Sequence, residues 1–149
     1  MASHLLDQIE VHEINVAIAA GTNDTDSDIL DMSGFDGVAF IVPITDSVAT
    51  GTLTLTMEHA DTNSGGAMAA TAATTAVTCA VNDDINDEFV VLDVLRPAKQ
   101  FVRLNFVTAT ANIATGNVIA IKYRARDEAT TQPTADVAGS AKFVSPATA

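Results

Sequence analysis

Hydrophobic and polar residues alternate along residues 99–108, and this segment carries the clearest structural signal in the chain. Val102, Leu104 and Phe106 occupy every second position, with Arg103 and Asn105 between them. Side chains point alternately to the two faces of a β-strand. The spacing therefore predicts a strand with one buried face.

Similar patterns recur along the chain, separated by polar and glycine-containing turns. The segments concerned are residues 9–19, 29–32, 38–45, 51–59, 76–81, 89–95 and 118–126. In the first of them the alternation slips by one residue at His12 and Glu13, which predicts a bulge. Together with residues 99–108 they make about eight short strands, and no amphipathic helix is evident. We therefore expect an all-β fold, an antiparallel β-sandwich that is jelly-roll-like, with extended terminal arms.

Residues 38–45 differ from the other strand candidates because both of their faces are apolar. Such a segment is typical of a strand that is covered on both sides or that forms a subunit contact. Pro43 lacks an N–H group, which places it at an edge or a bulge. We expect residues 38–45 and 51–59 to form a hairpin. Residues 61–75 and 82–88 are expected to be loops.

The length of 149 residues is that of one domain. We assign residues 1–8 to an N-terminal arm and residues 9–126 to the β-sandwich domain. Residues 127–149 are rich in Ala, Thr, Pro, Ser and Gly, which predicts an extended C-terminal arm. Phe143 and Val144 are the large apolar residues of this arm, and we expect Phe143 to anchor it on a neighbouring molecule.

Charge is distributed unevenly along the chain, whose net charge is −12. Residues 1–95 contain 16 of the 19 acidic residues and no Lys or Arg. Every Lys and Arg lies in residues 96–149, which contain only three acids. This asymmetry suggests pairing between copies or with an acidic partner surface, although acids on the body can also serve solubility alone. The candidate interface residues are Arg96, Lys99, Arg103, Lys122, Arg124, Arg126 and Phe143.

Three of these bases, Lys122, Arg124 and Arg126, fall on one face of the last predicted strand. They form either a docking stripe for acidic groups or a solvated face that protects a sheet edge. On the first interpretation, replacing all three by Ser weakens binding without unfolding the chain.

No catalytic constellation is recognisable, so we expect no enzymatic activity, no cofactor and no metal. The three histidines, His4, His12 and His59, lack metal-ligand spacing. Asp24, Asp26 and Asp28 have the spacing of a calcium loop, but the glycine and glutamate of that loop are missing. A solvated turn is the simpler interpretation of this segment.

Cys79 lies in an apolar run and is expected to be a small buried residue. The first residues lack the basic region of a secretory signal, and no apolar run is long enough to cross a membrane. The acidic composition argues against nucleic acid as a partner.

Three segments resemble small β-rich virion proteins of tailed bacteriophages. They are residues 33–42 (SGFDGVAFIV), residues 51–59 (GTLTLTMEH) with a following Ser64-Gly65 loop, and residues 99–106 (KQFVRLNF). The similarity is to capsid decoration, or cement, proteins, and it covers residues 28–126.

The resemblance implies a structural protein made in the bacterial host cytoplasm and located on the outer capsid surface of the virion. It implies a homotrimer that bridges subunits of the major capsid protein. Another β-rich virion component, such as a head fibre, tail or adaptor protein, remains an alternative. A carbohydrate-binding β-sandwich is a further one, although such sites favour exposed aromatic residues and this chain has one Tyr and no Trp.

Overall fold

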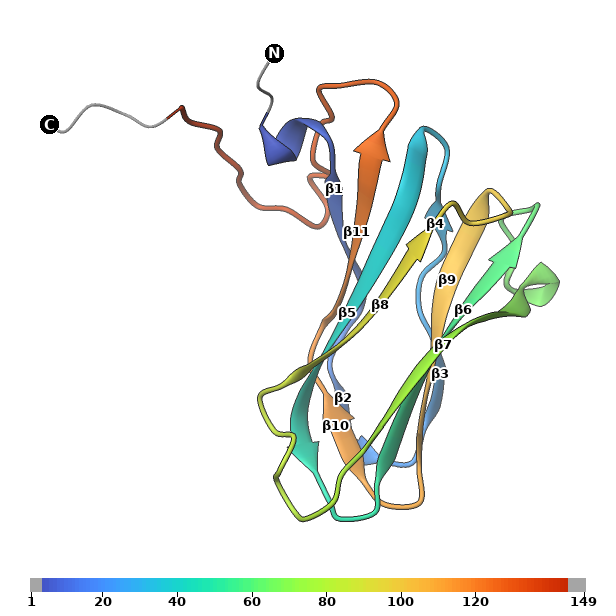
Figure 1. The fold of residues 1–149 in the computed structure, drawn as a ribbon, viewed down its shortest axis with the longest axis vertical. Helices are drawn as coiled ribbons and strands as arrows, with labels where there is room; N and C mark the ends of the chain where they lie inside the picture. The colour runs from blue at the N-terminus through green and yellow to red at the C-terminus, as the bar shows by residue number, and fades with distance from the viewer. Residues whose placement is uncertain (1–3, 145–149) are drawn as a thin grey trace, which may run out of the picture.

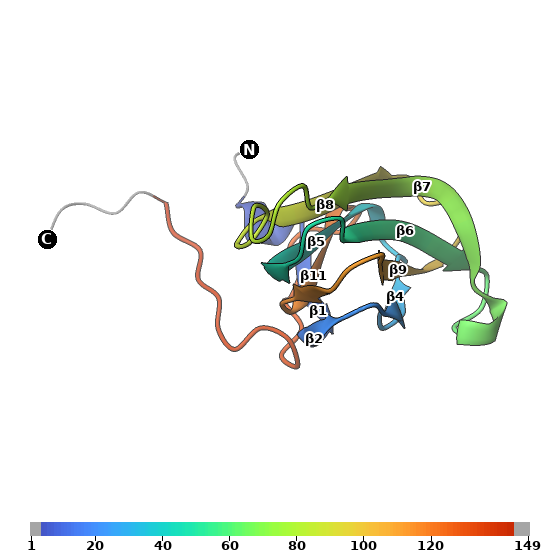
Figure 2. The same cartoon turned by 90° about the horizontal axis from the view of Figure 1, so that it is seen from below.

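The computed structural model describes residues 4–144 of the chain, which form two β-sheets packed face to face (Figures 1 and 2). No helix of this described part is long and apolar enough to cross a membrane. Its elements are η1 (Leu5–Asp7), β1 (Glu10–Asn15), β2 (Ile18–Gly21), β3 (Asp24–Asp26), β4 (Leu30–Asp31), β5 (Phe35–Ser47), β6 (Thr52–Ala60), η2 (Gly65–Ala67), β7 (Ala69–Thr78), β8 (Phe89–Leu95), β9 (Phe101–Ala109), β10 (Ile113–Thr115) and β11 (Val118–Ala125).

Sheet 1 contains β1, β11, β5 and β8 in that order, and β2 and β10 continue β1 and β11 past short interruptions. Sheet 2 contains β9, β6 and β7, with the short strands β3 and β4 both paired to β9. Counting each interrupted pair as one strand, the chain order is first, eighth, third and sixth in sheet 1, and second, seventh, fourth and fifth in sheet 2. This is the jelly-roll arrangement, so the predicted antiparallel β-sandwich is confirmed. The predicted N-terminal arm is not extended, because Leu5–Asp7 form the short 3-10 helix η1.

The predicted strand at residues 99–108 is β9, a central strand of sheet 2. Val102, Leu104 and Phe106 point into the core and are buried, as the alternation predicted. Opposite them, Phe40 and Val42 of β5 are fully buried. The two inner faces therefore build one apolar core between the sheets.

The predicted hairpin between residues 38–45 and 51–59 is wrong. These segments lie in β5 and β6, which belong to different sheets, and the turn at residues 48–51 carries the chain across the core. Gly51 is enclosed there by the carbonyl oxygen of Val48 and the side chain of Ile113. Alternation divides the side chains of a strand between its two faces, but it does not determine which strands pair.

The expected loop at residues 61–75 is also partly wrong, because residues 69–75 belong to the edge strand β7. This strand forms the hairpin partner of β6. Ala and Thr dominate it, and every second residue is exposed, so its sequence has no strongly apolar face. Threonine packs well on a pleated surface, and pairing with β6 settles the conformation of the alanines between them.

Two predicted irregularities are present in sheet 1. The register of β1 against β11 shifts between Glu13 and Asn15, next to the predicted slip. Pro43 lies in β5 beside the interruption between β10 and β11, where Gly116 donates its N–H to the Pro43 carbonyl over 2.9 Å. The gap between β10 and β11 leaves Pro43 without a paired residue on that side, which accommodates the missing proline donor in a central strand.

The C-terminal segment first runs back along β1 and then leaves the body (Figure 1). The Gln132 side chain accepts a hydrogen bond from the Val11 N–H and donates one to the Ile9 carbonyl. The Thr130 hydroxyl also donates to Ile9. These contacts occupy backbone groups at the β1 edge of sheet 1, which would otherwise invite pairing with another chain. The expected arm is therefore docked as far as about residue 137, and residues 138–144 extend from it with the Lys142–Asp7 ion pair as their contact to the body.

Candidate functional site

A hollow of about 440 Å³ lies at one end of the sandwich, where the β4–β5 turn, the β8–β9 loop and the end of β11 meet. It is lined by residues 32–36, residues 96–100 and Arg126. Three of the predicted interface residues, Arg96, Lys99 and Arg126, meet here although 30 positions separate the first from the last. We call this site the basic hollow.

Backbone hydrogen bonds hold the three segments of the basic hollow together. The N–H of Arg126 donates to the Gly34 carbonyl over 2.8 Å, and the N–H of Arg96 donates to the Asp36 carbonyl over 2.6 Å. Gly34 has a φ of +84°, a conformation that other residues rarely adopt, which explains a glycine in this turn. The walls of the hollow are therefore fixed by the fold.

Side-chain hydrogen bonds also tie two lining residues of the basic hollow, Ser33 and Gln100, to Asp31 behind them. Gln100 donates to the Ser33 hydroxyl over 2.8 Å and to the Asp31 carboxylate over 3.1 Å. The same carboxylate accepts the Ser33 N–H. Burial on its own raises the pKa of Asp31, but the hydrogen bonds from Ser33 and Gln100 outweigh burial and hold this pKa below its ordinary value.

The three bases of the basic hollow differ in how far their charge is already neutralised. Arg126 contacts Asp36 at 3.0 Å, and Lys99 contacts Asp61 at 3.0 Å. Arg96 is exposed, and within residues 4–144 its side chain forms no hydrogen bond or ion pair. Arg96 therefore offers a guanidinium group with all of its donors available to a partner, in a concave setting.

Arg103 is not available for binding in the same way. It lies on the outer face of sheet 2, where its guanidinium contacts Glu58 at 2.5 Å and Asp26 at 3.1 Å. Asp24 and Asp26 both accept hydrogen bonds from the Asn105 amide. Two of the three aspartates with calcium-loop spacing, Asp24 and Asp26, are therefore engaged with β9 as part of the short strand β3, and Asp28 lies beyond the end of that strand.

The predicted docking stripe on the last strand is wrong at Lys122. This residue points inward and is only 7% exposed. Its ammonium contacts Glu10 at 3.0 Å, donates to the Asp31 carbonyl over 3.1 Å and lies 4.5 Å from the centre of the Phe35 ring. The face that carries Lys122 is the core face, because Val118 and Ala120 on the same strand are buried.

Arg124 and Phe143, the remaining predicted residues, are both exposed. Arg124 has a φ of 54°, so the alternation of β11 breaks there and Lys122, Arg124 and Arg126 do not share one face. Phe143 lies on the extended arm, away from the basic hollow. The structure thus gathers three of the seven predicted residues and separates the other four.

Several residues of the basic hollow were not predicted as site residues, in particular Gln100, Asp36 and Gly34. The available signal was the run Ser33-Gly34-Phe35-Asp36-Gly37, which marks a tight turn. Nothing in that run indicates that it lies beside residues 96–100. The pairing of β4 with β9, through Leu30 and Val102, creates that neighbourhood.

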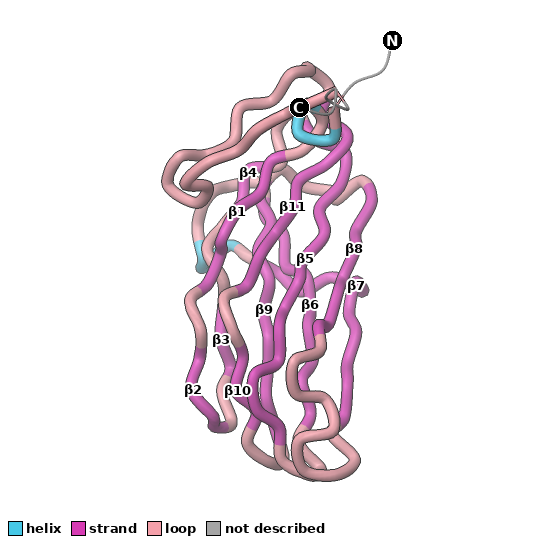
Figure 3. Tube along the Cα trace, turned by 90° about the vertical axis from the view of Figure 1, so that its left-hand side faces the viewer, coloured by secondary structure: helices cyan, strands magenta, loops and turns pink. Residues whose placement is uncertain are grey.

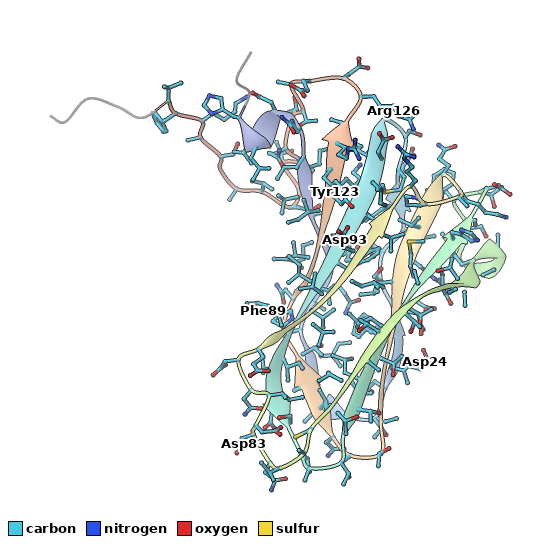
Figure 4. The ribbon with its side chains drawn as sticks, viewed as in Figure 1. Asp24, Asp83, Phe89, Asp93, Tyr123 and Arg126 are labelled. Atoms are coloured by element: carbon cyan, nitrogen blue, oxygen red, sulfur yellow. The ribbon has the colours of Figure 1, made fainter. Side chains whose placement is uncertain are left out.

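The opposite end of the sandwich carries an acidic turn at residues 83–88, far from Arg126 (Figure 4). Cys79 is buried beside it, and burial raises the pKa of its thiol, which donates to Asp84 over 3.0 Å. That hydrogen bond in turn lowers the pKa of Asp84. The prediction of Cys79 as a buried residue is confirmed. Among residues 4–144 no group of three His, Cys, Asp or Glu side chains has a metal-binding arrangement.

Comparison with models of known protein families and with curated proteins found no match to this chain.

Proposed function

We propose that this chain is a structural virion protein that binds the outer surface of a bacteriophage capsid and bridges subunits of the major capsid protein. The observation that carries the proposal is the basic hollow, which presents Arg96, Lys99 and Arg126 at one end of an otherwise acidic molecule. A positive, concave site on a negative body suits an acidic protrusion of a partner protein. The jelly-roll fold is common among viral capsid domains and is compatible with this role.

In the proposed role, many copies bind a repeating lattice, so modest affinity at each site is sufficient. Arg96 provides the free charge, and Lys99 and Arg126 add donors once they exchange Asp61 and Asp36 for partner carboxylates. Fork-shaped guanidinium groups favour carboxylates because two parallel hydrogen bonds can form. The partner group expected in the hollow is therefore an Asp or Glu side chain of the capsid protein.

Co-sedimentation with mature capsids that lack this chain tests the proposal. The informative variant is Arg96→Glu, and Arg124→Glu is its matched control. Both arginines are exposed, both have φ near +55°, and both substitutions change the net charge equally. We expect Arg96→Glu to lower capsid occupancy by about tenfold, or ~1.4 kcal/mol, and Arg124→Glu to leave it near the wild-type value.

Wild-type protein that stays in the supernatant at all concentrations would contradict the capsid-binding function. Equal occupancy for Arg96→Glu and the wild type would instead contradict the assignment of the basic hollow. Circular dichroism of each variant establishes that the fold is intact before binding is compared.

A further inference from the structure

The outer face of sheet 1 is apolar across three neighbouring strands. Strand register places Leu95, Gly37 and Tyr123 in one row, and Val91, Ile41 and Ile119 in another. Between these rows lie Asp93, Ala39 and Ile121, and beyond them Phe89 lies opposite Pro43. Figure 3 faces this side and shows β8, β5, β11 and β1 side by side across the front of the molecule.

Large side chains on this face are open to solvent. Phe89 is 66% exposed, Val91 53%, Leu95 50% and Ile119 37%. Figure 4 shows Phe89 projecting from β8 on the sheet 1 side. The outer face of sheet 2 is different, since it presents Thr52, Thr54 and Thr56 from β6 and Arg103 and Asn105 from β9. One solvated polar face per sheet is the usual arrangement, so the apolar face of sheet 1 is the exception that needs a partner.

Charge limits what that partner is. Within these three strands Asp93 is the one carboxylate of the face, and it accepts a hydrogen bond from the Tyr123 hydroxyl over 2.5 Å. Glu13 of β1, which lies in register with Ile119, marks the border of the face. Two copies with a net charge of −12 repel each other over most of their surfaces. Repulsion is weakest where this nearly uncharged face meets the same face of another copy. A strongly charged partner finds no complementary group here.

The area of the face sets a second requirement. Three strands about 4.8 Å apart and about seven residues long give a plane of roughly 14 Å by 24 Å, or about 340 Å². A stable interface buries about 800 Å² on each partner. The flat face therefore supplies only part of the area, and a further segment has to contribute the rest.

The C-terminal arm is positioned to supply it. Residues 138–144 leave the body on the sheet 1 side (Figures 1 and 2), and Phe143 and Val144 are 76% and 82% exposed. The contact found between this described stretch and the body is the ion pair of Lys142 with Asp7 at 2.6 Å. Seven extended residues reach about 23 Å, enough to pass beside a molecule seated on the face.

We infer that copies of this chain associate through the outer face of sheet 1, with the C-terminal arm of each copy packing Phe143 and Val144 against the other. This self-association deepens the proposed function, and rests on it, because it names a second copy of the chain as a further partner. The test uses the purified full chain without capsids, so a failure of self-association is distinguishable from a failure of capsid binding.

The experiment is sedimentation equilibrium of the full chain at low and high salt. The informative variant is Val91→Lys, and Val81→Lys is its matched control. Val81 is 62% exposed and lies on the turn after β7, outside the face. Both substitutions replace valine with lysine, so they change the net charge by the same amount. We expect the wild type and Val81→Lys to be oligomeric, with masses that do not fall at high salt, and Val91→Lys to be monomeric.

Two further variants keep the test decisive if Val91→Lys does not fold. Phe89→Lys at the other end of β8, and the double variant Phe143→Ser with Val144→Ser, are each expected to weaken association at least about tenfold. A monomeric wild type would overturn the inference. It would equally be overturned if folded Val91→Lys and Phe89→Lys both kept the wild-type mass, because some other surface would then hold the copies together.

Discussion

The ammonium group of Lys122 lies 3.0 Å from a carboxylate oxygen of Glu10, across the pair formed by β11 and β1. The two residues are direct partners in the register of these strands, and both point toward the inside of sheet 1. The same Glu10 oxygen lies 3.0 Å from His12, whose other ring nitrogen lies 3.3 Å from Asp136. This chain of contacts links the interior to the docked part of the C-terminal segment.

Replacing Lys122 should destabilise the fold more than it affects binding. Lys122→Met leaves the Glu10 carboxylate partly buried without its cation, and we expect a loss of about 2–3 kcal/mol in the free energy of unfolding. Arg124→Met, on the exposed end of the same strand, should change it by less than about 0.5 kcal/mol. Urea denaturation measures both. Equal midpoints for the two variants would show that the buried pair has no special role in stability.

Acid should weaken the fold through Glu10. Burial alone raises the pKa of Glu10, but the hydrogen bonds from Lys122 and His12 lower it by more. The pKa of Glu10 in the folded chain therefore lies below its ordinary value of 4.5. The unfolded chain therefore binds more protons than the folded chain, and stability falls as the pH drops below about 4.5. We expect thermal midpoints to fall less steeply with acid in Glu10→Gln. Glu128→Gln, which removes an exposed carboxylate, is the control and should follow the wild type.

The hydroxyl of Tyr123 should titrate unusually late. Burial and the hydrogen bond to Asp93 raise its pKa to about 12. It is the only tyrosine of the chain, so ultraviolet absorbance follows it without interference. We expect Asp93→Asn to move the titration toward the ordinary value of 10.0, because the negative charge beside the phenol is lost. A wild-type midpoint near 10 would refute the contact in solution.

Gly37 should not tolerate a side chain, because a Cβ atom there would lie 2.1 Å from Cζ of the Tyr123 ring. Gly37→Ala displaces the ring from the sheet 1 face, and we expect a cost of about 2 kcal/mol. Gly66→Ala is the matched control, since nothing lies within 4 Å of its Cβ position and its φ is unstrained. Denaturation midpoints compare the two. An unchanged denaturation midpoint for Gly37→Ala would mean that the Tyr123 ring moves aside at no cost in stability.

The candidate site was only partly predictable. Charge asymmetry alone identified Arg96, Lys99 and Arg126, because bases are confined to the end of the sequence. Charge asymmetry did not separate these three bases from the buried Lys122. Alternation did not separate them either, because it shows that two sets of side chains face opposite ways without showing which set faces the core. In β11 the small residues Val118 and Ala120 face inward with Lys122, while Ile119 and Ile121 face outward. A hydrophobicity pattern favours the opposite assignment.

The amino-acid sequence by itself determined the all-β class, the buried faces of β6 and β9, and the change of character after residue 126. These follow from local periodicity and composition, which act within one strand or segment. Tertiary structure decided the rest: which sheet each strand joined, the burial of Lys122 and the meeting of residues 32–36 with residues 96–100. Pairing between distant strands depends on how two sheets cover one core, and that is a property of the whole chain.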